Sequence, residues 1–128
     1  MLCRFYEVGE ELGRGAFGVV RKCAYKQTGQ IYAVKIIDLR PLRLRENFNP
    51  TRLRREVDIM RRLRHPNITE FVDVFETSDQ LLVVMEYAPG TELFDMILAK
   101  KRYPEDEARW VFAQVARALL YLHSMNIV

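Results

Sequence analysis

Three glycines near the amino terminus, Gly13, Gly15 and Gly18, fall in the pattern G-x-G-x-x-G-x-V, which Val20 completes. Glycine lacks a Cβ atom, so its backbone can approach other groups closely and tolerates positive φ. Phosphate is the usual group that needs such an approach, because N–H groups in a glycine-rich loop are donors that no side chain obstructs. The spacing therefore suggests phosphate binding.

The glycine pattern leaves two folds open, and the residues after it distinguish them. In one fold it opens a helix that cradles a dinucleotide. In the other it joins two antiparallel strands and covers the phosphates of ATP. Residues 19–25 and 31–37 are rich in β-branched and aromatic residues, and Gly29 with its neighbours predicts a turn between them. Asp38 has the spacing of an acidic ribose ligand, but the strand–turn–strand pattern interrupts the required helix and favours the second fold.

Lys35 carries a charge inside the apolar strand predicted at residues 31–37. A lysine in this setting either reaches water from the edge of a sheet or holds its ammonium group for a ligand. This segment by itself leaves both interpretations open.

A helix is predicted to begin at Asn49-Pro50, since asparagine is a favoured N-cap and proline a favoured first residue. It should end near residue 64, before a proline. Glu56 falls within the apolar stripe of this helix, and a buried carboxylate is costly unless it is paired. Glu56 therefore either meets a cation from another element, for which Lys35 would serve, or lies at the rim of the stripe. The stripe consists of Leu53, Val57, Met60 and Leu63, and the opposite, solvated face carries Arg54, Arg55, Arg61 and Arg62.

The remaining chain is predicted to alternate between strands, connectors and helices. The helix that starts at residues 104–107 is apolar around most of its circumference, which normally indicates burial, yet no other segment remains to cover it. The other expected elements are an irregular basic segment at 40–48, interrupted by Pro41, strands at 68–75 and 81–85, a connector at 86–91 and a short helix at 92–99.

Composition bounds the class of protein. The chain has 128 residues, a one-domain length, with 49% hydrophobic and 29% charged residues and a net charge of +3. Two distant cysteines, Cys3 and Cys23, give no disulfide framework and fit a reducing, intracellular compartment, cytoplasm or nucleus. No signal peptide or membrane span is expected. Six arginines could bind an anionic partner: Arg40, Arg43, Arg45, Arg52, Arg54 and Arg55. A solvated helix face with a basic loop is the simpler interpretation of these residues.

Taken together, these motifs resemble the eukaryotic protein kinase family, serine/threonine type, from about residue 6 to residue 128. Subfamily features are similar to the calcium/calmodulin-dependent group, including death-associated and checkpoint-type kinases. The matching residues are the glycine pattern, Ala33-Val34-Lys35, Glu56, His65-Pro66-Asn67-Ile68, Met85, Glu86 to Ala88, Glu92-Leu93-Phe94-Asp95 and Tyr121-Leu122-His123-Ser124.

The resemblance implies a role for each matching position. Lys35 would hold the α- and β-phosphates of ATP, and Glu56 would hold Lys35 in place; these two are the catalytic residues implied within the chain. Val20 and Ala33 would sandwich the adenine, and Met85 would gate the pocket. The implied ATP-binding residues are Leu12, Gly13, Arg14, Gly15, Ala16, Phe17, Gly18, Val19, Val20, Ala33, Lys35, Met85, Glu86, Ala88 and Glu92.

The resemblance also implies an α+β fold: an antiparallel sheet with one regulatory helix, as in the kinase N-lobe, at about residues 6–85. A hinge at 86–91 and the first helices of the C-lobe at 92–128 would follow. The catalytic loop of the family would begin after Val128, so the proton-accepting aspartate and the Mg²⁺ ligands of a full-length kinase fall outside these residues. The sequence thus predicts the ATP-binding portion of a kinase that phosphorylates protein hydroxyls, inactive by itself. The alternative is a non-catalytic pseudokinase or scaffold; no nucleic acid partner is expected.

Overall fold

The computed structural model describes residues 1–16 and 18–128, so the predicted role of Phe17 lies outside the described residues. The chain divides into two compact units. The first, here called the sheet unit, comprises Met1–Leu63 and Thr69–Ala88, and the second, the helical unit, comprises Arg64–Ile68 and Pro89–Val128.

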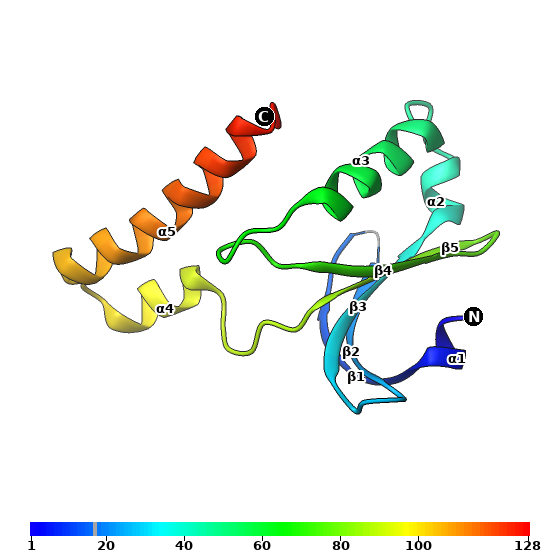
Figure 1. Ribbon diagram of the computed structural model, residues 1–128, viewed down its shortest axis with the longest axis horizontal. Coiled ribbons are helices and arrows are strands. Elements are labelled where there is room, and N and C mark those ends of the chain that lie inside the picture. Colours follow the sequence, from blue (N-terminus) through cyan, green and yellow to red (C-terminus); the bar gives the residue numbers. More distant parts are fainter. Residues whose placement is uncertain (17) are drawn as a thin grey trace. The chain divides into compact units, whose positions relative to one another are not determined.

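The sheet unit is built on five antiparallel strands in the order β1-β2-β3-β5-β4 (Figure 1). The predicted turn between the second and third strands forms, and Gly29 occupies its positive-φ position at 74°. The strands are β1 (Tyr6–Arg14), β2 (Gly18–Tyr25), β3 (Ile31–Asp38), β4 (Phe71–Glu76) and β5 (Gln80–Glu86).

Three helices accompany this sheet: α1 (Leu2–Phe5), α2 (Leu39–Arg43) and α3 (Pro50–Arg62). The N-cap prediction for α3 is confirmed, because the Asn49 side chain accepts hydrogen bonds from the N–H groups of Thr51 and Arg52 at 2.9 and 3.2 Å. Figure 1 shows α3 lying along one face of the sheet.

Two apolar clusters form on the two faces of the sheet. One contains Leu2, Tyr6, Cys23, Val34, Leu82 and Val84, and the other contains Leu39, Val57, Leu81 and Val83. Because successive strand residues point to opposite faces, Val83 and Val84 serve different clusters. Burial of β5 on both faces and its place between β3 and β4 confirm the predicted central strand.

The segment at residues 40–48 differs from its predicted irregular form, because it begins with α2. Pro41 is the third residue of that helix, where a missing N–H group breaks no intrahelical hydrogen bond. The Asp38 carboxylate caps the helix by accepting from the N–H of Arg40 at 3.0 Å.

The helical unit contains α4 (Leu93–Lys100) and α5 (Glu105–Ser124); both ends of α4 and the start of α5 lie within one residue of the predicted positions. It also includes the short loop at 64–68. The Tyr121 hydroxyl accepts from the N–H of Arg64 at 2.9 Å, and the Tyr121 ring lies 5.1 Å from that of His65. Neither helix contains a buried residue.

Candidate functional site

Strand register brings four of the predicted site residues onto one face of the sheet. Val20 pairs with Lys35 across β2 and β3, and Ala33 pairs with Met85 across β3 and β5. Directly paired residues share a face, as do residues two apart on one strand. Val20, Ala33, Lys35 and Met85 therefore lie together on the face that α3 covers. Val19 pairs with Ile36 and lies on the opposite face, so the structure does not bring it to this group.

The glycine pattern links β1 to β2, as the strand–turn–strand interpretation predicts. Gly18 has a structural reason to lack a side chain, since a Cβ atom there would lie 2.0 Å from the carbonyl oxygen of Ile36. A Cβ atom at Gly13 or Gly15 would meet no described atom within 4 Å. Because neither glycine has positive φ, packing in this chain explains Gly18 but leaves the other two unexplained.

The remaining residues of the loop are exposed. Leu12 and Ala16 are solvent-accessible, and Arg14 makes a bidentate ion pair with Glu11, with donor–acceptor distances of 2.9 and 3.2 Å. The N–H of Gly15 donates to the carbonyl oxygen of Gly18 at 2.9 Å, which narrows the loop at its base. Backbone amides in a narrow exposed loop are available to an anion only where they do not already bond within the chain.

A cavity of about 680 Å³ lies between the sheet and α3, and both predicted catalytic residues line it. Lys35 and Met85 come from the sheet; Glu56 and Met60 come from the helix. Val57 of α3 is buried with Val83 of β5, so packing of the helix on the sheet holds the two walls of the cavity together.

Glu56 is paired in the structure with a residue of its own helix. Its side chain is 58% exposed, and it accepts from Arg52 Nε at 3.3 Å, one turn earlier on the same helix. Among the described residues, Lys35 has no ion pair. The structure therefore favours the rim position for Glu56, because the buried centre of the stripe is Val57 and Glu56 reaches solvent beside it.

The sequence contains the signal that would have identified this partner. Arginine and glutamate four residues apart lie on the same side of a helix, and Arg52 stands four residues before Glu56.

Sheet topology bears on the two interpretations of Lys35, an edge lysine that reaches water and an ammonium group held for a ligand. β3 pairs with β2 on one side and β5 on the other, so Lys35 is not on an edge strand. Its side chain is nevertheless exposed, because the face at this position opens into the cavity.

The predicted hinge extends from the end of β5. The N–H of Glu86 donates to the carbonyl oxygen of Glu70 at 2.8 Å, and the Lys22 ammonium lies 5.2 Å from the centre of the Tyr87 ring. Ala88 is exposed and is the last residue of the sheet unit. Glu92, the predicted ribose-side residue, is the N-cap of α4 in the helical unit.

Internal ion pairs partly neutralise the basic set considered for an anionic partner. Arg40 Nη2 lies 2.7 Å from Asp38 Oδ2, and Arg54 Nη2 lies 3.2 Å from Glu76 Oε1. The Arg40 side chain and, after it, the Arg40 backbone N–H lower the pKa of Asp38 to about 2. These pairs favour a solvated face over a binding patch. Across residues 1–16 and 18–128, no helix has the length and apolar character needed to cross a membrane.

Sequence comparison defines the family. The model of the protein kinase domain family matches residues 6–128, and the chain belongs to this family. Myosin light chain kinase A of Dictyostelium discoideum is 42% identical over 98% of this chain and 41% of its own length. Death-associated protein kinase 2 of Mus musculus is 40% identical over 96% of this chain and 34% of its own length. Serine/threonine-protein kinase DCLK3 of Mus musculus is 35% identical over 98% of this chain and 15% of its own length.

These matches confirm the resemblance to serine/threonine kinases, and the antiparallel sheet with its helices confirms the predicted fold class. The chain therefore spans between 15% and 41% of the length of these relatives.

Proposed function

We propose that the sheet unit binds ATP as part of a serine/threonine protein kinase that transfers the γ-phosphate to protein hydroxyls. The observation that carries this proposal is the shared face of Val20, Ala33, Lys35 and Met85. Two small or branched apolar residues beside an accessible ammonium group suit a flat base with a polyphosphate attached.

The glycine loop supports the same proposal. Gly13 pairs with Val20, which pairs with Lys35, so the loop begins in the same cross-strand row as the lysine. No described atom lies within 4 Å of a Cβ atom built at Gly13 or Gly15, which leaves room for a phosphate close to the backbone. In this proposal the other ATP-binding residues are those named from the sequence, with Glu86 and Ala88 on the adenine side and Glu92 on the ribose side.

Lys35 and Glu56 take the proposed catalytic roles. The Lys35 ammonium would neutralise the α- and β-phosphates, a task for which a lysine without an intramolecular ion pair is suited. Glu56 would orient Lys35 after exchanging Arg52 for it, because the present carboxylate–guanidinium pair is exposed and such pairs contribute about 0–1 kcal/mol.

We further propose that residues 1–128 do not transfer phosphate by themselves. Phosphoryl transfer depends on Mg²⁺ to neutralise charge on the phosphates. In protein kinases an aspartate and a catalytic-loop asparagine hold the Mg²⁺ ions, and both positions fall outside residues 1–128. Residues 6–85, 86–91 and 92–128 would form the N-lobe, the hinge and the start of the C-lobe of the full-length kinase, which would work inside the cell. A non-catalytic scaffold or pseudokinase with the same sheet is the second candidate.

Titration of the 128-residue chain with ATP, followed by calorimetry, tests the proposal. Lys35→Met should weaken ATP binding about tenfold, equivalent to ~1.4 kcal/mol, without loss of stability. Lys101→Met removes the same charge from the helical unit and should leave ATP affinity unchanged. Equal affinities for the chain and its Lys35→Met variant, or no ATP binding by the chain, would contradict the proposed site. Phosphate transfer to a protein substrate by the chain alone would contradict the proposed inactivity.

A further inference from the structure

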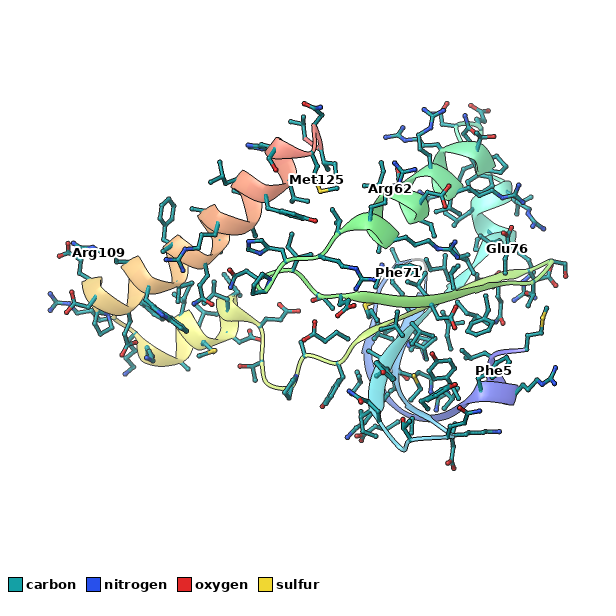
Figure 2. The ribbon with its side chains drawn as sticks, in the orientation of Figure 1. Phe5, Arg62, Phe71, Glu76, Arg109 and Met125 are labelled. Atoms are coloured by element: carbon teal, nitrogen blue, oxygen red, sulfur yellow. The ribbon has the colours of Figure 1, made fainter. Side chains whose placement is uncertain are left out.

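A second cavity, of about 340 Å³, opens on the face of the sheet away from α3. Figure 2 shows Phe5 on α1 at this side of the sheet. The cavity is independent of the proposed ATP site, because none of the residues that line it belongs to that site. Its lining is Phe5, Tyr6, Tyr25, Tyr32, Val72 and Asp73.

Four of these six residues are aromatic, and each of their rings contacts another ring. Tyr6 lies 5.3 Å from Tyr25 and 6.2 Å from Tyr32, between ring centres, with tilted and edge-on geometry. The Phe5 ring stacks on the Phe75 ring with 6.3 Å between ring centres, and Phe75 packs against the apolar cluster that contains Tyr6. Tyr6 is buried, so the base of the cavity is rigid, whereas Phe5 at the entrance is 40% exposed. The cavity is thus a box of aromatic rings with an open side.

A register shift in β4 adds a carboxylate to this box. Phe71 pairs with Met85, and Asp73 pairs with Val84, so Val72 is an extra residue in the strand, as in a β-bulge. Without that residue, the position after Phe71 would pair with Val84. The shift brings Val72 and Asp73 together into the lining of the cavity.

Asp73 lacks a cationic partner among the described residues. Its Oδ1 accepts from the N–H of Val74 at 2.9 Å, and the group is partly buried. Burial, and after it the charge of Asp73, raise the pKa of Tyr6 to about 12. The negative charge of Asp73 is therefore felt at the base of the cavity and is not cancelled by an ion pair.

We propose that this cavity binds a methylated ammonium group, such as a quaternary amine or a trimethylated lysine side chain. Aromatic faces attract cations, and a methylated ammonium is less strongly hydrated than a free one, so it enters a box of rings more readily. Asp73 supplies the counter-charge. The Arg4 guanidinium lies 5.6 Å from the centre of the Phe5 ring, within the range of a cation–π contact.

NMR titration of the 128-residue chain with choline tests the proposal, with its neutral isostere 3,3-dimethylbutan-1-ol as the matched ligand control. Choline should produce saturable shifts at Phe5, Tyr25, Tyr32 and Asp73, and the neutral alcohol should bind at least tenfold more weakly. Equal affinity for the two would show that the cavity selects shape and not charge, and would overturn the proposal, as would the absence of saturable shifts.

Variants of the lining separate the contributions of charge and rings. Asp73→Asn keeps an oxygen acceptor for the N–H of Val74 but removes the charge, and should weaken choline binding about tenfold. Asp79→Asn removes a charge outside the lining and should leave binding unchanged. Phe5→Leu keeps an apolar side chain without the ring and should weaken binding severalfold. Comparable effects of Asp73→Asn and Asp79→Asn would contradict a specific role for Asp73. Thermal unfolding of each variant separates lost binding from lost folding.

A pair of peptides distinguishes the two sources of the ligand. A trimethyllysine peptide that binds more tightly than choline, while the same peptide with unmodified lysine does not bind, would assign the cavity to a methylated protein. Choline binding equal to or tighter than that of the trimethyllysine peptide would assign it to a small quaternary amine. Tighter binding of the unmodified peptide would overturn the proposal.

Discussion

The sheet unit and the helical unit place their apolar side chains very differently. Val34 and Val84 of the sheet unit are fully buried, on the same face of adjacent strands. In the helical unit, Trp110 is 68% exposed and Phe112 is 72% exposed, although twelve of the twenty residues of α5 are apolar. All eleven buried hydrophobic residues of the described chain belong to the sheet unit.

Local interactions support the helical unit in place of a core. Glu105, Asp106 and Glu107 occupy the first turn of α5, where the helix dipole favours negative charge. Arg109 Nη2 lies 3.0 Å from Glu105 Oε1, and Lys100 forms an ion pair with Glu107. Each such exposed pair contributes at most about 1 kcal/mol. The comparison teaches that an apolar helix pattern predicts a helix but not the surface that covers it.

Gly18→Ala should give the largest effect, confined to the sheet unit. The new Cβ atom would lie 2.0 Å from the carbonyl oxygen of Ile36, a backbone atom that cannot move without disturbing the β2–β3 ladder. We expect a loss of about 3 kcal/mol in the free energy of unfolding, at the upper end for overpacking. Urea denaturation followed by circular dichroism measures it. Gly15→Ala, with no described atom within 4 Å of its Cβ, is the control, and an equal loss there would contradict the close-approach argument.

Val84→Ala and Phe112→Ala test the comparison directly. Val84 is fully buried, so its truncation leaves a cavity and should cost about 2 kcal/mol. Phe112 is exposed, so its larger truncation should change stability by less than about 0.5 kcal/mol. Both values come from the same denaturation experiment. A cost for Phe112→Ala equal to that for Val84→Ala would mean that α5 has a core partner in solution.

Lowering the pH should destabilise the sheet unit by protonating Asp38. This is the smallest of the three expected effects on stability. Because Arg40 lowers the pKa of Asp38 to about 2, the charged carboxylate stabilises the fold above the ordinary range near 4, and this stabilisation is lost as pH falls toward 2. NMR titration should show the amide signals of α2 changing with this carboxyl group. The Asp38→Asn variant should lose that transition. A pKa of Asp38 at its ordinary value would contradict the proposed interaction of Asp38 with Arg40.

Sequence patterns anticipated the elements better than the side-chain partners. The Gly29 turn, the Asn49 cap and the acidic first turn of α5 are encoded by residues close together in the chain, and all three are present. The sequence could not decide between the two positions left open for Glu56, because a helical wheel gives the direction of a side chain but not the depth at which the helix sits on the sheet. Arg52 is a neighbour on the same helix, and so it reaches the carboxylate whatever that depth is.

The candidate site likewise combines features that the sequence predicts with features that only the tertiary structure decides. The sequence by itself determined the family, the glycine loop and the strand that carries Lys35, because these depend on residue type and local spacing. Only the tertiary structure decided that Val20, Ala33, Lys35 and Met85 share a face while Val19 does not, since register is set between strands. The register shift that turns Asp73 toward the aromatic cavity was decided there too, because one inserted residue in β4 acts only through its pairing with β5.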